Sequence, residues 1–198
     1  IINHLISKFK LKKYLEIGVR DGTNFKKIMI KDKTAVDPEP TDEIKNDSNV
    51  KIMTSDSYFD SIKNSNQKFD IIFIDGLHLE YQVDNDIKNS LNYLNDNGFI
   101  IMHDCNPPTK FHQRTNYELK NGQTPCWNGT VWRSYVKLRM NNPRLNMCVV
   151  NCDWGIGIIQ NGKQRCIKKD KDFRYNYLDS DRVNVLNLIS VYDFLQKF

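Results

Sequence analysis

The chain has 198 residues, of which 39% are hydrophobic and 27% are charged, and its formal net charge is +5. This length suits one domain with a substantial core, and the composition is that of an ordinary globular protein. The sequence has no run of about 18 apolar residues, so we expect no membrane span. Its lysines and arginines are scattered, which argues against nucleic-acid binding and suits an anionic small substrate.

The cysteines are odd in number and include no CxxC pair, so neither a disulfide framework nor a zinc site is expected. Reduced thiols in a cytoplasmic protein are the default interpretation. The chain begins Ile1-Ile-Asn3, without Met and without a secretory leader. We therefore expect a single domain over residues 1–198. The sequence is compatible with a domain excised from a longer multidomain protein, with fused domains and with a homo-oligomer.

The first elements in chain order are a helix over residues 1–10, a strand over 13–18 and a glycine turn. After the turn, Phe25 and Ile28 fit a second helix. Glycines at a strand-to-helix turn let the backbone approach a ligand closely, and a helix N-terminus presents free N–H groups. The turn therefore predicts a ligand-binding segment around Gly18 and Gly22.

The next strand covers residues 34–37 and ends at Asp37, 19 residues after Gly18. An acid in this position is placed to accept hydrogen bonds from ribose hydroxyls, and the alternative is that it caps the next turn. A third strand covers residues 50–53. Ser55 or Asp56 is expected to cap the helix that begins near Tyr58.

Residues 68–108 contain two apolar strands, 69–74 and 99–102, joined by a helical pattern that includes Ile87 and Leu94. Such a strand–helix–strand unit predicts a parallel pair with a right-handed crossover. Each strand ends in a polar cluster at the edge where open parallel sheets bind ligands. We therefore expect four side chains to converge at one site: Asp75, His78, His103 and Asp104.

Residues 105–130 form an irregular stretch of the length that often acts as a lid or substrate loop. Four of its side chains suit stacking and hydrogen bonding with a sugar or heterocycle: His112, Arg114, Tyr117 and Trp127. A helix over 130–140 follows, and then two strands, 145–150 and 155–159, whose short connection predicts an antiparallel hairpin. A helix over 182–198 is expected to close the chain.

Several of these segments together resemble the class I S-adenosylmethionine-dependent methyltransferases, above all the macrocin-type sugar O-methyltransferases. The resemblance lies in Glu16-x-Gly18-x-x-x-Gly22, in Asp37 and Asp56, and in the runs IDGLH (74–78) and MHDCNP (102–107). It spans essentially the whole chain, and the two runs at this separation are fairly specific. It implies an α/β, Rossmann-like three-layer sandwich with a seven-stranded, mostly parallel sheet, in which the C-terminal hairpin adds one antiparallel strand.

The resemblance also implies a role for each cofactor residue. Glu16, Gly18 and Gly22 would line the methionine moiety, Asp37 would hold the ribose, and Asp56 with Ser57 would lie by the adenine. Asp75 would sit beneath the sulfonium. Arg20 stands where many relatives have a glycine, and it would either close over the cofactor or point outwards.

Methyl transfer to a hydroxyl requires that the hydroxyl be positioned and lose its proton. His78 or His103 can act as the base, because histidine titrates near neutral pH. Asp104 can instead be the base, or can orient a histidine. The alternative for each histidine is a supporting hydrogen bond rather than catalysis.

A magnesium ion is a further expectation by analogy with catechol-type methyltransferases, in which acids after the fourth and fifth strands bind the metal. Asp75 and Asp104 occupy similar positions, and Asn106 can supply a third oxygen ligand. Cys105 differs from the catechol group, which has Asn at that place.

The sequence therefore predicts an S-adenosylmethionine-dependent O-methyltransferase acting on a sugar, nucleotide-sugar or glycan precursor. One alternative is an NAD-dependent sugar-nucleotide oxidoreductase or epimerase, although the turn lacks GxGxxG. A nucleic-acid methyltransferase is disfavoured, because Asp75-Gly-Leu-His78 replaces the Asn/Asp-Pro-Pro-aromatic motif usual in base amino-methylating enzymes. A non-catalytic cofactor-binding module is the third alternative.

Overall fold

Strands and helices alternate through residues 13–102 of the chain. The computed structural model describes residues 1–118, 125–168 and 174–198. The chain forms two compact units. The first consists of Ile1–Leu77, Asp84–Ile101 and Phe198, and the second of His78–Val83 and Met102–Lys197.

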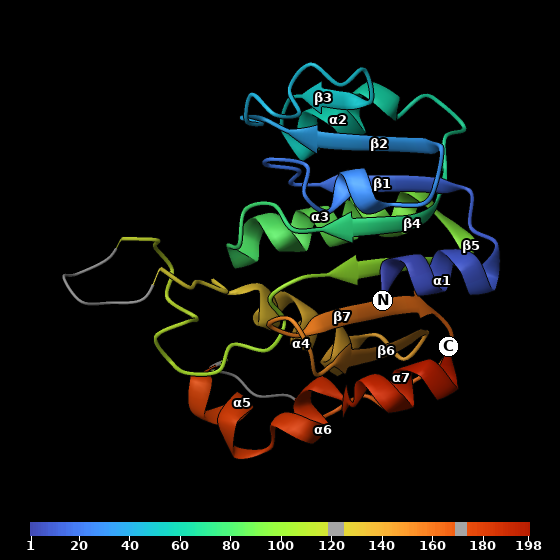
Figure 1. Ribbon diagram of the computed structural model, residues 1–198. Helices are drawn as coiled ribbons and strands as arrows, with labels where there is room; N and C mark the ends of the chain where they lie inside the picture. The colour runs from blue at the N-terminus through green and yellow to red at the C-terminus, as the bar shows by residue number, and fades with distance from the viewer. Residues whose placement is uncertain (119–124, 169–173) are drawn as a thin grey trace. The chain divides into compact units, whose positions relative to one another are not determined.

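The first unit contains strands in the order β3-β2-β1-β4-β5 (Figure 1). β1 is parallel to both β2 and β4, and β3 is parallel to β2. β1 and β4 are buried along most of their length, as expected for strands of a parallel sheet that is covered on both faces. The strand bounds are β1 (Lys13–Ile17), β2 (Asp32–Asp37), β3 (Val50–Ile52), β4 (Phe69–Ile74) and β5 (Leu94–Met102), the last residue of which belongs to the second unit.

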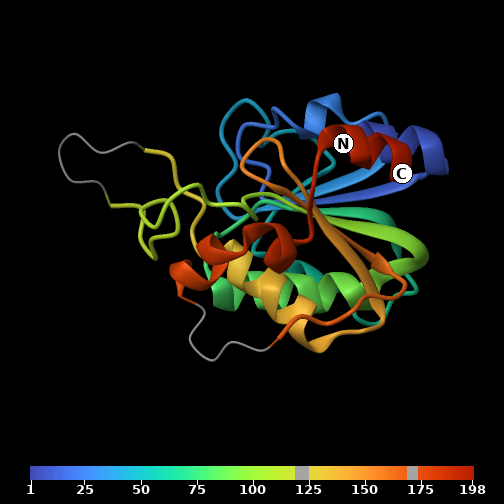
Figure 2. The same cartoon turned by 90° about the horizontal axis from the view of Figure 1, so that it is seen from below.

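Helices cover both faces of this sheet, and Figures 1 and 2 show α1 (Ile2–Phe9) and α3 (Glu80–Tyr93) on opposite sides of it. The third helix is α2 (Ser55–Ile62). Phe99 of β5 packs between Phe9, at a ring-centroid distance of 5.0 Å, and Phe198, at 6.1 Å. The core of the unit therefore includes both ends of the chain.

The prediction of a helix after the glycine turn is wrong. Only a short 3₁₀ turn, η1 (Phe25–Lys27), is present. Phe25 and Ile28 are both buried, and a spacing of three residues suits a 3₁₀ turn as well as an α-helix. Lys33 Nζ donates to the carbonyls of Phe25 and Ile28 at 2.7 and 3.2 Å, so these carbonyls have a side-chain partner instead of continuing a helix.

Two other helix boundaries differ from expectation. Thr54, rather than Ser55 or Asp56, caps α2, because its Oγ1 accepts the Ser57 N–H at 3.2 Å. At the end of α3, Leu94 already begins β5 instead of completing the helix. At each boundary, neighbouring residues are suited to either structure. The sequence alone therefore does not fix the residue at which the helix begins or ends.

The second unit is built on the expected hairpin of β6 (Leu145–Val150) and β7 (Ile156–Asn161), which pair in antiparallel fashion. Figure 2 shows α4 (Val131–Asn141) and α7 (Val191–Lys197) on opposite faces of this hairpin. The remaining elements are α5 (Tyr175–Ser180), α6 (Arg182–Leu186) and β8 (Leu188–Ile189), which is parallel to β6.

The prediction of a single C-terminal helix over 182–198 is wrong as well. Asn187 adopts left-handed φ and ψ of 49° and 55°, and its side chain donates to the Met147 carbonyl at 2.7 Å. The chain therefore turns and adds β8 before α7 begins.

The α/β, Rossmann-like class with one antiparallel strand pair is confirmed, with eight strands in the described residues rather than seven. In that same part of the chain, no helix has both the length and the apolar character needed to cross a membrane.

Candidate functional site

The glycine turn after β1 is packed directly against the end of β4, both within the first unit. Gly18 has a φ of +85°, and a Cβ added to it would lie 2.2 Å from the carbonyl oxygen of Asp75. The Asp75 N–H in turn donates to the Ile17 carbonyl at 2.8 Å. This approach leaves no room for a side chain at Gly18, so the predicted cofactor residues Gly18 and Asp75 are neighbours.

The Asp37 side chain closes the same turn. Its Oδ2 accepts the Val19 and Arg20 N–H groups, each at 2.9 Å, and its Oδ1 accepts the Glu39 N–H at 2.9 Å. The carboxylate thus bonds the turn, as the alternative interpretation expected. A carboxylate offers about four acceptor positions, so capacity remains for a ribose hydroxyl and the ribose role stays a prediction. Arg20 itself is exposed, with a φ of 47°.

Glu16 is almost fully buried, at 2% exposure, and two side chains that sequence reasoning missed surround it. Tyr14 donates its hydroxyl proton to Glu16 Oε2, and Asn24 Nδ2 donates to the same oxygen at 2.8 Å. Burial raises the pKa of the Glu16 carboxyl to about 7, although both hydrogen bonds oppose the increase. The pKa of Tyr14 is also raised, by its burial and then by the Glu16 charge.

The other cofactor candidates also belong to the first unit, and Gly22 is buried whereas Asp56 and Ser57 are exposed. Gly22 has a φ of +76° and an added Cβ there would lie 2.8 Å from the Ile44 side chain. Asp56 and Ser57 are exposed in the first turn of α2. Their predicted contacts with methionine and adenine stay predictions.

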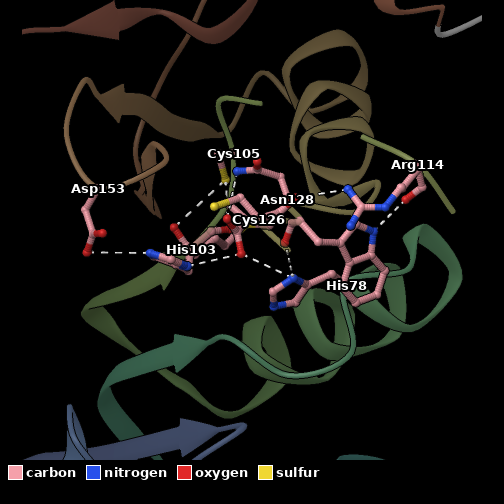
Figure 3. A network of polar contacts seen from close by, with 10 residues as sticks. His78, His103, Cys105, Arg114, Cys126, Asn128 and Asp153 are labelled. Carbon is pink, nitrogen blue, oxygen red and sulfur yellow. Dashed lines mark hydrogen bonds and ion pairs between the residues drawn. The ribbon is translucent and has the colours of Figure 1, made fainter. Parts of the chain in front are cut away.

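The catalytic candidates form a network inside the second unit (Figure 3). At its centre is Asp104, whose Oδ2 lies 3.2 Å from His78 Nδ1 and 3.1 Å from His103 Nδ1. Asn128 Nδ2 donates to the other oxygen, Oδ1, at 2.7 Å. The Asp104 side chain is only 6% exposed, so its negative charge acts at close range on both imidazoles.

The backbone fixes His78 in this network. The Thr130 N–H donates to the His78 carbonyl at 2.8 Å, and a Cβ on Gly129 would lie 2.0 Å from that oxygen. The His78 ring stacks on Trp127 with a centroid distance of 5.2 Å, and its Nδ1 also lies 3.2 Å from the Trp127 carbonyl. The Trp127 ring therefore packs on the face of the His78 imidazole, and polar contacts at Nδ1 hold its edge.

His103 has a second acidic neighbour that the sequence did not reveal. Its Nε2 lies 3.5 Å from Asp153 Oδ2, and Asp153 belongs to the turn between β6 and β7 (Figure 3). Asn128 was missed as well. Both residues are far from His103 and Asp104 in the sequence.

The acceptors facing His78 Nδ1 favour the tautomer in which Nδ1 carries the proton, and this leaves Nε2 as the basic nitrogen of His78. His103 has a carboxylate near each of its two nitrogens. The Asp104 carboxylate also stabilises an imidazolium if Nε2 takes up a proton. The network is therefore built to hold a proton acceptor in one orientation.

The four predicted substrate residues divide into two kinds. Tyr117 packs edge-on against Trp127 at 5.6 Å and is 56% exposed, so both rings remain candidates for acceptor binding. Arg114 instead joins two arms of the loop, because its NH1 donates to Cys126 O at 2.9 Å while Trp127 Nε1 donates to Arg114 O at 2.7 Å. His112 accepts or donates at Thr109 Oγ1, 2.8 Å away, and burial lowers its pKa. Residues 119–124 of the predicted lid lie outside the described residues.

Of the proposed magnesium ligands, Asp75 belongs to the first unit and Asp104 to the second. Asp104 already accepts hydrogen bonds on both oxygens, and Asn106 Oδ1 accepts from Arg182 NH1 at 2.6 Å. Burial raises the pKa of the Cys105 thiol far above its ordinary value, so Cys105 does not replace the missing oxygen ligand. An ion bound by Asp104 or Asn106 would compete with these hydrogen bonds, and magnesium stays a prediction.

One segment of the chain is similar to a known protein family. Residues 15–105 match a family model described as a methyltransferase domain. No curated protein sequence matches the chain. Among solved structures, a Staphylococcus aureus protein provisionally named a caffeoyl-CoA O-methyltransferase has a TM-score of 0.58 and 20% identity, covering 81% of each chain.

Two further structures share the fold. The S-adenosylhomocysteine-bound methyltransferase PaMTH1 of Podospora anserina has a TM-score of 0.57 and 17% identity, with 82% of this chain and 76% of that chain covered. MycE, from the mycinamycin biosynthetic pathway, was solved with Mg, S-adenosylhomocysteine and mycinamycin VI, with a TM-score of 0.52 and 12% identity over 81% of this chain and 49% of that chain. Residues 15–105 are therefore similar to a methyltransferase domain, and the solved structures show that the chain shares their fold.

Proposed function

We propose that the chain transfers a methyl group from S-adenosylmethionine to a hydroxyl of a sugar, nucleotide sugar or glycan precursor. The observation that carries this proposal is the buried Asp104 carboxylate held between two imidazoles and an amide. A hydroxyl is a poor nucleophile while protonated, and an oriented imidazole is the group that removes such a proton near neutral pH.

The first unit would hold the cofactor, which supplies an electrophilic methyl group on a sulfonium when it is bound. Gly18 and Asp75 offer a close-packed backbone, and Asp37 offers a carboxylate with remaining acceptor capacity. Their donor and acceptor chemistry fits an amino-acid head and a ribose, and none of them is suited to binding a phosphate.

Two of the proposed residues, Asp75 and His78, are close neighbours in the chain. His78 follows Asp75 by three residues, so their α-carbons cannot be more than about 11 Å apart. Asp104 likewise follows the end of β5 by two residues. By sequence alone, the predicted cofactor residue Asp75 and the proposed base His78 both follow β4, and Asp104 follows β5.

In the proposed step His78 is the base. As the acceptor oxygen bonds to the methyl carbon and the sulfur–carbon bond breaks, the hydroxyl proton passes to His78 Nε2. Asp104, facing Nδ1 at 3.2 Å, stabilises the imidazolium that results. His103 is the alternative base, with Asp104 on one nitrogen and Asp153 near the other.

A sugar acceptor is supported by the polar and aromatic side chains around this network. His78, Trp127 and Tyr117 form a row of ring contacts at 5.2 and 5.6 Å, and Tyr117 is exposed. An NAD-dependent oxidoreductase is not favoured, because the matched family is a methyltransferase domain.

The cofactor is tested by calorimetric titration of the purified chain with S-adenosylhomocysteine, with NAD in a parallel cell. We expect binding of the first compound and none of the second. Binding of NAD alone would overturn the proposal, and binding of neither would favour a non-catalytic module.

The base is tested by transfer of tritium from methyl-labelled S-adenosylmethionine to a panel of nucleotide sugars. We expect Asp104→Asn to lower the rate about 10²- to 10⁴-fold, the range for general-base catalysis, with unchanged binding of S-adenosylhomocysteine. His78→Gln should cost more than His103→Gln. The reverse order would assign the base to His103, and an undiminished rate in Asp104→Asn would refute the network's role.

A further inference from the structure

A tryptophan lies exposed on a strained turn beside the catalytic network. Trp154, in the turn between β6 and β7, is 40% exposed. Three successive residues of this turn have positive φ: 42° at Asp153, 61° at Trp154 and 89° at Gly155. Non-glycine residues rarely adopt this conformation, and they keep it only where surrounding contacts enforce it.

Those contacts come from the backbone that directly follows Asp104. The Asn106 N–H donates to the Trp154 carbonyl at 2.8 Å, and the Cys105 N–H donates to the Gly155 carbonyl at 2.9 Å. A Cβ on Gly155 would lie 2.3 Å from the Asn106 Cβ, so the turn sits as close as glycine allows. The exposed indole is therefore held in a fixed position rather than carried on a loose loop.

Polar groups and one further ring surround the indole. The His112 ring lies 5.6 Å from it, in a tilted arrangement. The Asp153 side chain is 72% exposed and reaches His103, as Figure 3 shows. The amides of Asn106 and Asn151 bond each other at 3.2 Å beside the same turn.

We propose that Trp154 is the platform on which a pyranose ring of the acceptor stacks, with the Asp153 carboxylate bonding its hydroxyls. This inference rests on the proposed function and names the acceptor class more narrowly. A pyranose has a C–H face that packs on an aromatic ring and a rim of hydroxyls that needs acceptors and donors. The exposed indole offers the ring, and the exposed Asp153 carboxylate next to it in the chain offers acceptors for the hydroxyls, whereas a flat phenol is better held in an apolar slot.

Indole nitrogen NMR provides the test, because the chain has three tryptophans and hence three Nε1–H resonances. The probes are methyl glucopyranoside, methyl galactopyranoside and methyl rhamnopyranoside, with catechol as the rival and S-adenosylhomocysteine present throughout. We expect at least one pyranoside to shift the Trp154 resonance. Trp132 serves as the internal control, since it is fully buried and its Nε1 donates to Gln113 at 3.1 Å.

Two variants complete the design. Saturation transfer from the protein to the pyranoside should be lost in Trp154→Leu and retained in Trp154→Phe, which keeps a ring. Both variants should bind S-adenosylhomocysteine like the parent chain, because the predicted cofactor residues lie in the first unit. A Trp154 resonance that moves only with catechol, or with none of the four compounds, overturns the inference. Failure of the parent chain to bind S-adenosylhomocysteine is a separate result that overturns the proposed function.

Discussion

Glu16 should make the folded chain less stable as pH rises, and replacing it with glutamine should remove that loss. Its pKa is about 7 in the folded chain and 4.5 when unperturbed. Between these values the folded state binds more protons than the unfolded state, so the unfolding free energy falls with rising pH. At 1.36 kcal/mol per pKa unit the total loss is about 3 kcal/mol, complete near pH 8 and absent below about pH 4.5.

Urea unfolding of the parent chain and of Glu16→Gln at several pH values between 4.5 and 8 measures this loss. Far-UV circular dichroism is the better probe, since Trp127, Trp132 and Trp154 all lie in the second unit and Glu16 lies in the first. The advantage of the variant should grow by about 3 kcal/mol across the range. Glu39→Gln, at an exposed position, is the matched control. Parallel pH profiles for Glu16→Gln and the parent would show that the buried carboxyl is ionised throughout, and the reasoning would fail.

Three further results are expected. Gly18→Ala should lose at least about 3 kcal/mol of stability or its S-adenosylhomocysteine binding, since the new Cβ meets Asp75 O at 2.2 Å. Gly76→Ala is the control and should be tolerated, because the nearest contact of its new Cβ is at 3.4 Å. Equal loss of stability for the two variants in urea unfolding would contradict this prediction. Asp37→Asn should weaken binding of S-adenosylhomocysteine more than that of its 2′-deoxyribose analogue in calorimetry; equal weakening would limit Asp37 to closing the turn. Methyl transfer should fall in excess EDTA and recover with added Mg²⁺ if the predicted magnesium site exists, and unchanged activity would refute that site.

The strands were predictable because each is an apolar run bounded by turn residues. All seven expected strands are present, since burial on both faces leaves a strong pattern in the sequence. Helices were harder where the same spacing fits two structures. Phe25 and Ile28 are three residues apart, a separation that suits both the expected α-helix and the 3₁₀ turn that forms. The left-handed Asn187 that splits the C-terminal helix has no signal beyond the known tolerance of Asn for that conformation.

Parts of the candidate site could be predicted from strand ends alone. His78, His103 and Asp104 follow two strands of one unit of structure, so the rule for parallel sheets was enough to group them, and these three do meet. Asn128 and Asp153 reach the same network from a loop and a hairpin turn. Only long-range packing brings them there, and no local pattern encodes such packing.

The sequence could also suggest a base without suggesting how its orientation is enforced. Asp104 has a φ of 62°, a conformation that a non-glycine residue adopts at a cost of about 1–3 kcal/mol. Three side-chain donors and acceptors converge on its carboxylate, and the turn that carries Trp154 binds the two residues after it. The strain at Asp104 and the strain at Trp154 are therefore held by one set of hydrogen bonds. This coupling explains why a surface tryptophan and a buried carboxylate, 50 residues apart in the chain, would be expected to act on the same acceptor.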